Sequence, residues 1–208
     1  MLPDSLPYMK SDEAIARQLT ELNKNVELLD SQRGGAERLI DSVVLAAPAA
    51  LITFANIPNI YEHLVVRWYA RGNRNATSAP MYVRFNNDVG ANYDMLEIFV
   101  NPVSVFFAGG AIGATQIQVG QPAALTAPAN AFDMGDIKIF GYASLIGQKV
   151  FMARSTIKVA LAAVSLYSLW FNGWWRNVGA ITEIDIYPLA NDFIAGSRFD
   201  LYGIQGGV

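Results

Sequence analysis

Apolar and polar residues alternate with a period of two along much of this sequence, and this pattern restricts the fold more than any other feature. In residues 64–71, apolar residues at every second position alternate with Arg67, Tyr69 and Arg71. Such alternation is typical of a β-strand with one buried face. The same pattern returns in residues 81–86, 183–187 and 198–202.

Turn sequences with glycine or asparagine separate the alternating segments. They occur at residues 71–73, 86–90, 171–173 and 195–197. No helical stretch lies between successive strands, so we expect antiparallel rather than parallel pairing. The sequence therefore predicts a mainly β fold, an antiparallel jelly-roll-like β-sandwich with an N-terminal α-helix.

Charged and aromatic residues are distributed unevenly along the chain. Residues 1–41 hold 13 charged residues and one aromatic residue, whereas the remaining 167 residues hold 20 charged and 23 aromatic residues. A change of this size indicates two parts in different surroundings. We expect an N-terminal helical anchor over residues 1–41, built on a short coiled coil, and a jelly-roll-like domain over residues 42–208.

The anchor carries apolar residues at alternating intervals of four and three. Ile15, Leu22 and Leu29 fall at one heptad position, and Leu19 and Val26 fall at the other. Two heptads are marginal as an isolated helix. The stripe fits either one amphipathic helix packed on its own domain or a short parallel bundle held together by a larger oligomeric domain, and the bundle is our first interpretation.

Composition excludes many classes of site. The sequence has no cysteine and a single histidine, His63, so a thiolate site or a site of several imidazoles cannot form. Glu62 adjoins His63, but strand neighbours point to opposite faces, so we expect no dyad. No cofactor is expected, and the formal charge of −3 argues against a nucleic-acid partner.

The most apolar run, residues 159–171, is shorter than the roughly 18 residues that a spanning helix needs. We therefore expect no membrane insertion. No signal peptide is apparent, which predicts assembly in the cytoplasm. The Ala- and Gly-rich residues 101–133, with one strand near 115–119, are expected at subunit contacts.

Two sets of acidic residues have spacings that resemble those of known catalytic or metal-binding sites. Glu183 and Asp185 share one strand face, the spacing that a glycosidase pair would need, although a solvated surface pair is the commoner case. Residues 88–94 alternate oxygen-bearing side chains as calcium loops do, but lack the terminal glutamate of an EF-hand. We favour an ordinary turn closed by Asx side chains.

Three tryptophans within six residues form the most distinctive cluster of the chain. Trp170, Trp174 and Trp175 each offer a large apolar area and one N–H donor. They fit a core or interface role, and alternatively a platform for glycans. We keep all three as interface or glycan candidates.

Three patterns occur in order along the second part: IP..Y.HL at residues 57–64, RFNND.GANYD at residues 84–94 and AGSRF.LYGI at residues 195–204. With residues 175–182, they resemble a family of tailed-bacteriophage virion structural proteins, in which Asn87 is often Gly. The resemblance extends from about residue 50 to residue 204. Residues 101–149 and the first 45 residues lie outside it.

This resemblance implies a non-enzymatic virion protein with a β-sandwich displayed on the head or tail, and no catalytic residues. We expect a homotrimer that contacts other capsid or tail proteins, either as head decoration (cement) or as a short fibre or spike. A tail-fibre receptor-binding protein that engages host surface glycans is the alternative. An envelope-degrading enzyme is a third candidate, for which the sequence has no recognisable site.

Overall fold

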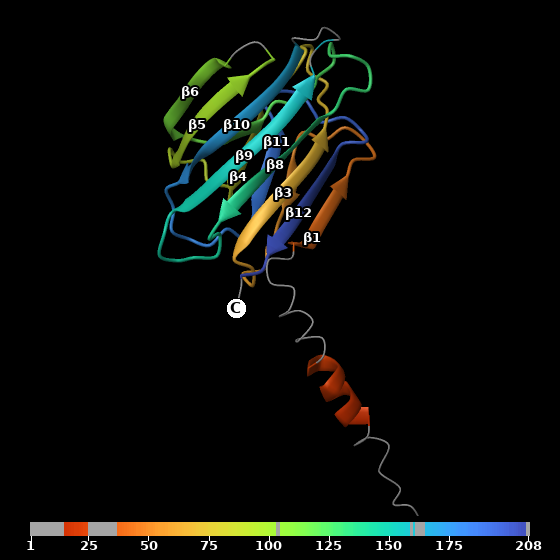
Figure 1. Ribbon diagram of the computed structural model, residues 1–208, viewed down its shortest axis with the longest axis vertical. Coiled ribbons are helices and arrows are strands. Elements are labelled where there is room, and N and C mark those ends of the chain that lie inside the picture. The colour runs from red at the N-terminus through yellow and green to blue at the C-terminus, as the bar shows by residue number, and fades with distance from the viewer. Residues whose placement is uncertain (1–14, 25–36, 103–104, 159, 161–164, 207–208) are drawn as a thin grey trace, which may run out of the picture. The chain divides into compact units, whose positions relative to one another are not determined.

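The structure is a computed structural model that describes residues 15–24, 37–102, 105–158, 160 and 165–206. Residues 15–24 form a helix, and the remainder forms one compact β unit from Glu37 to Gln205 (Figure 1). Its strands are β1 (Glu37–Val44), β2 (Ile52–Phe54), β3 (His63–Ala70), β4 (Met81–Phe85), β5 (Tyr93–Val100), β6 (Val105–Ala114), β7 (Ile117–Gly120), β8 (Asp133–Phe140), β9 (Lys149–Lys158), β10 (Leu166–Trp175), β11 (Ile184–Pro188) and β12 (Arg198–Ile204).

Two antiparallel sheets contain these strands. The larger has the order β1-β12-β3-β8-β9-β10-β5-β6, and the smaller has the order β2-β11-β4-β7. Four pairs are nested in sequence: β1 with β12, β2 with β11, β3 with β8, and β4 with β7. This nesting is the arrangement of a jelly roll. The predicted fold class is therefore confirmed.

Two hairpins are inserted into the jelly roll. β5 and β6 lie between β4 and β7 in the chain, and β9 and β10 lie between β8 and β11. Both hairpins join the larger sheet beyond β8, so that it reaches eight strands. The smaller sheet keeps four.

The core lies between the sheets, and alternation decides which residues enter it. In β9, buried and exposed residues alternate without interruption from Lys149 to Lys158. Phe85 of the smaller sheet meets Trp175 of the larger one, with ring centroids 5.7 Å apart. Burial of apolar side chains, aromatic rings among them, is the dominant favourable contribution to folding.

Four of the predicted strands are confirmed as β3, β4, β11 and β12, and the segment near residues 115–119 overlaps β7. The turn predicted at residues 171–173 is wrong, because these residues lie inside β10. Gly173 is needed there for a close approach: a Cβ atom on it would lie 2.0 Å from the Asp94 carbonyl oxygen and 2.6 Å from the Phe151 ring.

The compact β unit begins with β1 at Glu37, within the few residues around the expected junction and five residues before Ser42. The charged residues of β1 caused the difference, because an edge strand exposes more polar side chains than a central one. Of the predicted helical stripe, Ile15, Leu19 and Leu22 lie in the described helix, and Val26 and Leu29 lie outside the described residues.

Candidate functional site

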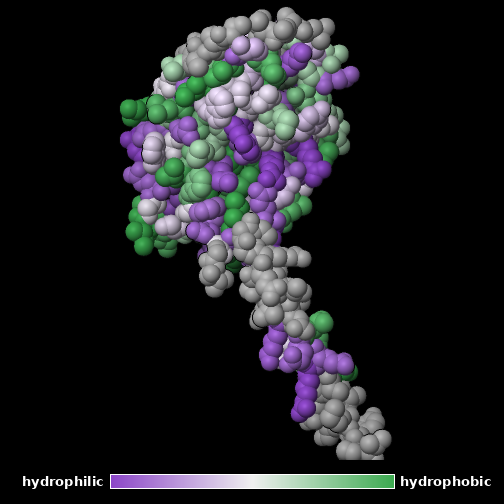
Figure 2. Space-filling view, viewed as in Figure 1, coloured by the Kyte–Doolittle hydropathy of each residue, from purple (hydrophilic) through white to green (hydrophobic). Residues whose placement is uncertain are grey.

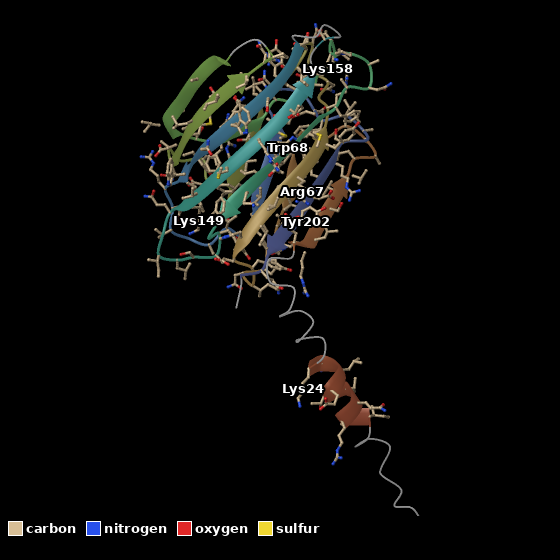
Figure 3. All side chains as sticks on the ribbon, in the orientation of Figure 1. Lys24, Arg67, Trp68, Lys149, Lys158 and Tyr202 are labelled. Carbon is tan, nitrogen blue, oxygen red and sulfur yellow. The ribbon has the colours of Figure 1, made fainter. Side chains whose placement is uncertain are left out.

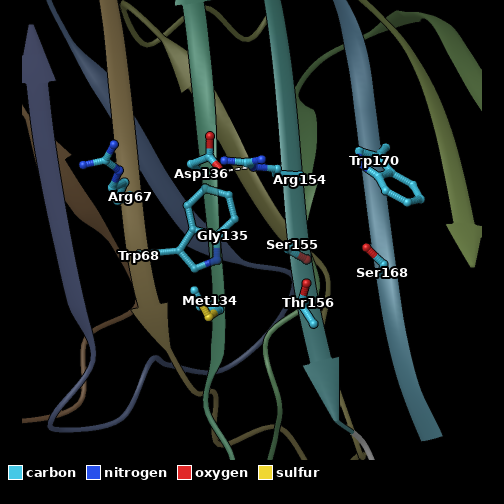
Figure 4. A pocket seen from close by; sticks show the side chains of 10 residues that line it. All are labelled: Arg67, Trp68, Met134, Gly135, Asp136, Arg154, Ser155, Thr156, Ser168 and Trp170. Carbon is cyan, nitrogen blue, oxygen red and sulfur yellow. Dashed lines mark hydrogen bonds and ion pairs between the residues drawn. The ribbon is translucent and has the colours of Figure 1, made fainter. Parts of the chain in front are cut away.

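The outer face of the eight-stranded sheet, which points away from the four-stranded sheet, carries a row of side chains from neighbouring strands. Pairing places Arg67 of β3 beside Asp136 of β8, Asp136 beside Arg154 of β9, and Arg154 beside Trp170 of β10. Figure 4 shows these four side chains in order across the sheet. Strand register alone brings together residues that are up to 103 positions apart in sequence.

An ion pair occupies the middle of this row. Arg154 Nε donates to Asp136 Oδ1 at 2.5 Å, and the Arg154 side chain is 71% exposed. The hydrogen bond and charge of Asp136 raise the pKa of Arg154, so the guanidinium stays charged. Exposed pairs of this kind add about 0–1 kcal/mol to stability. The pair is therefore more important for the character of the surface than for folding.

Arg67 is held at the β3 end of the row. Its Nη2 atom lies 2.6 Å from Glu37 Oε2. The guanidinium also lies over the Tyr202 ring, 4.9 Å from its centroid, and the two side chains are seen together in Figure 3. A cation over an aromatic face is attracted by the ring quadrupole. Arg67 is thus already paired with charge and ring on its own molecule.

Two hollows flank the Arg154–Asp136 pair. The first, about 490 Å³, is bordered by Thr156 and Ser168, and the second, about 310 Å³, by Lys138 and Asn172. Asp136, Arg154 and Trp170 line both. We call the two together the β8–β10 groove. Its lining includes Arg67, Asp136, Lys138, Arg154, Trp170 and Asn172, together with the apolar side chains of Met134, Phe140 and Met152.

The structure separates the three predicted tryptophans. Trp170 and Trp174 are 43% and 44% exposed on the outer face, whereas Trp175 is buried. Only Trp170 of these lines the groove. Residues 170 and 174 are four positions apart and so point to the same face of β10, whereas residue 175 points to the opposite face. Trp175 is therefore a core residue, as one of the two sequence interpretations held.

Residues 86–92, which connect β4 to β5, form a hydrogen-bonded turn. Asp88 accepts the backbone N–H of Gly90 at 2.8 Å and the side-chain amide of Asn92 at 2.9 Å. Asn86 and Asn87 have φ near +52° and +55°, the left-handed region that asparagine and glycine tolerate. The Asx turn is confirmed. Among the described residues, no three His, Asp or Glu side chains gather as metal ligands.

The other polar candidates have structural surroundings. Asp185 is buried and accepts the Thr53 hydroxyl at 2.6 Å, while Glu183 lies just before β11. His63 Nδ1 accepts the Gly141 N–H at 3.2 Å. Glu62 Oε1 lies 3.8 Å from His63 Nε2, so the prediction that these two side chains point to opposite faces is wrong. Glu62 precedes β3, and the alternation of side chains along a strand therefore does not apply to it.

A buried carboxyl lies on the inner side of β8. Asp133 is fully buried and accepts the Trp68 indole N–H at 3.4 Å, while its Oδ1 and the Ser155 hydroxyl have no hydrogen-bond partner among the described residues. Burial raises the pKa of Asp133 to about 8, although the hydrogen bond from Trp68 opposes that shift. Asp133 is thus protonated at neutral pH.

Asp136, Lys138, Arg154 and Ser168 are site residues that the sequence analysis did not single out. The sequence of β9 gives no clear local signal for Arg154, because apolar Val150 and Met152 point outward with it while Lys149 and Ser155 point inward. The meeting of the four site residues depends on the pairing of β8, β9 and β10, which no short motif encodes.

The helix exposes its apolar stripe. Ile15, Leu19 and Leu22 are each more than half exposed. Among the described residues, no helix has the length and apolar composition needed to cross a bilayer.

Fold and surface together define an antiparallel jelly-roll protein with an amphipathic outer groove. Comparison of the chain with protein-family models, with curated proteins and with solved structures gives no match.

Proposed function

We propose that the chain is a non-enzymatic structural protein of a bacteriophage virion, a homotrimeric surface component that attaches to the particle through its N-terminal helix. The observation that carries this proposal is the exposed stripe of Ile15, Leu19 and Leu22 on the helix. Three large apolar side chains at heptad spacing need a partner surface, because leaving them in water forgoes about 1.5–3 kcal/mol each.

One edge of the jelly roll supports contact between chains. β6 ends the larger sheet, and its ten residues carry no charge. β1, at the opposite edge, carries Glu37, Arg38 and Asp41. Charged residues on an edge strand discourage pairing with other chains, and their absence favours it. β6 is therefore our candidate for a contact between copies.

The attachment role can be tested in the full-length chain by Leu19→Asp together with Leu22→Asp. Both side chains are exposed, so the β unit should melt as in the wild type. We expect the double variant to be lost from purified virions, whereas the matched polar control Arg17→Ser should be incorporated normally. Normal incorporation of the double variant would contradict the proposal.

Association can be measured independently by sedimentation of a chain that begins at residue 34, which keeps β1 complete. We expect an oligomer, with a trimer as the expected state, because the β unit holds the apolar edge. If the shortened chain sediments as a monomer, the β unit is not the source of association.

Recognition of host surface glycans is the second candidate function. The β8–β10 groove favours it, because an exposed indole stands beside side chains that can donate and accept hydrogen bonds. Imaging of labelled chains on virions separates the two roles, since decoration predicts label over the head and receptor binding predicts label at the tail.

A further inference from the structure

We propose that the β8–β10 groove binds an acidic saccharide, with Trp170 as the stacking surface and Lys138 as the partner of the anionic group. This inference rests on the proposed function in its receptor-binding form, because a virion surface protein meets host glycans. It adds the chemical class of the ligand and the side chains that select it.

Trp170 occupies the position that a sugar-stacking residue requires. It lines both hollows. Its paired neighbours, Arg154 on β9 and Ile98 on β5, are large, yet they leave 43% of the Trp170 surface exposed. An indole offers a flat apolar face to the C–H side of a pyranose and costs little conformational entropy when it binds. One residue that borders both hollows can contact two consecutive sugar units.

The centre of the groove favours a hydroxylated ligand over a protein surface. The Arg154–Asp136 pair lies there, and protein interfaces are depleted of charged residues at their centres. An apolar partner would remove water from both ions without replacing their hydrogen bonds, which is costly. Sugar hydroxyls can both donate to Asp136 and accept from Arg154.

Neutral polar groups extend this hydrogen-bonding capacity along the groove. Thr156 and Ser168 border the first hollow, and Asn172 borders the second. Hydroxyl and amide groups donate and accept equally well, as sugar hydroxyls do. Figure 2 shows hydrophobic and hydrophilic residues interspersed over this face, which suits a ligand with both apolar and polar sides.

Charge decides the class of saccharide. Arg154 is paired with Asp136, and Arg67 is paired with Glu37. Lys138 lines the second hollow and is in none of the ion pairs among the residues that the structure describes. The second hollow thus presents one uncompensated positive charge. A carboxylate on the bound sugar would neutralise it, which an uncharged saccharide cannot do.

The test uses the full-length protein and an array that pairs each acidic saccharide with a neutral counterpart: 3′-sialyllactose with lactose, and tetragalacturonate with its methyl ester. We expect at least one acid to bind about tenfold more tightly than its counterpart, a difference of about 1.4 kcal/mol. Titration calorimetry then gives the affinity of each variant.

Trp170→Ala should weaken binding at least about tenfold. Trp174→Ala is the matched control: it has the same exposure, strand and face but lies outside the groove, so its affinity should stay within about twofold of the wild type. Lys138→Gln should bring the ratio of acid to neutral affinity close to one and leave the neutral affinity unchanged.

The proposal is overturned if no acidic saccharide binds, if Trp170→Ala binds like the wild type, or if Lys138→Gln keeps the preference for the acid. A smaller oligomer for Trp170→Ala would also overturn it, because the face would then lie between copies. Loss of sugar binding by Trp170→Ala with normal incorporation into virions supports the groove. Incorporation of the Leu19→Asp, Leu22→Asp chain counts against the attachment role alone.

Discussion

The Trp175 indole N–H donates to Asp88 Oδ2 at 2.7 Å, which joins the end of β10 to the turn that follows β4. The two strands belong to different sheets. Because the same carboxylate also closes the turn through Gly90 and Asn92, one side chain connects a local turn to the packing of the two sheets. The RFNND.GANYD pattern thus has a structural explanation in this chain.

Asp88→Ala should destabilise the fold by about 1–3 kcal/mol, because it leaves the Trp175 N–H without its acceptor. Asp88→Asn keeps an acceptor oxygen and should cost less. Burial pushes the pKa of Asp88 upward, but hydrogen bonds from Trp175, Asn92 and Gly90 outweigh it and lower that pKa below its ordinary 3.8. This stabilising contribution is present above pH 3.8 and is lost as the pH falls through the folded-state pKa. Urea unfolding at pH 7 and at pH 3 checks both statements; equal losses for the two variants would contradict the role of the acceptor.

Trp175→Ala should lower stability by about 3–5 kcal/mol, because it removes a buried ring packed against Phe85 and Tyr93. Arg198→Ala should change thermal melting far less: Arg198 Nε lies 2.8 Å from Asp200 Oδ2, but its side chain is half exposed. Melting curves of both variants, with cell-adsorption assays, provide the measurement. Unchanged melting with lost adsorption would assign either residue to binding instead.

Stability should fall as the pH rises from about 4 to about 8, because Asp133 stays protonated in the fold up to about pH 8 while the unfolded chain ionises near 3.8. The unfolded state binds fewer protons over this range, so the slope is negative and reaches at most about 1.4 kcal/mol per pH unit. Asp133→Asn should flatten the profile and stabilise the protein at pH 8.5 relative to the wild type. Parallel profiles for the two proteins would show that Asp133 does not titrate in this range.

Gly203→Ala should destabilise the sandwich by about 1–3 kcal/mol, because a Cβ atom would lie 2.3 Å from the Tyr61 ring. Gly147→Ala is the control, since a Cβ atom there would meet nothing within 4 Å. Chemical denaturation measures both. Adding Tyr61→Ala should make the Gly203→Ala change nearly neutral, and an equally large loss in that background would exclude the steric cause.

The sequence predicted the fold class because alternation and turn residues act locally. β3, β4, β11 and β12 have clean alternation, and each appears where expected. β10 was missed because Asn172-Gly173 is a typical turn sequence. In this strand, Gly173 instead provides room for the backbone of β5 and the Phe151 ring. A local signal was overruled by tertiary packing.

The candidate site was only partly predictable for the same reason. Composition drew attention to Trp170, Trp174 and Trp175. Because the sequence analysis did not predict β10, it could not show that Trp175 points to the face opposite the other two. Asp136 and Arg154 lie 18 positions apart and meet because β8 and β9 pair in one register. No composition or spacing rule identifies that meeting. The network around Asp88 was foreseen as an Asx turn, but its bond to Trp175 was not.

One of the two inserted hairpins, β9 and β10, carries part of the groove but none of the nested strand pairs. Eight nested strands form the jelly roll. Arg154 and Trp170 lie on β9 and β10, which belong to one continuous segment of the chain between β8 and β11. Mutations confined to the exposed side chains of β9 and β10 should leave the four nested pairs in place. A change confined to β9 and β10 would therefore alter the Trp170 side of the groove, while Asp136 and Lys138 on β8 would keep their places in the sheet.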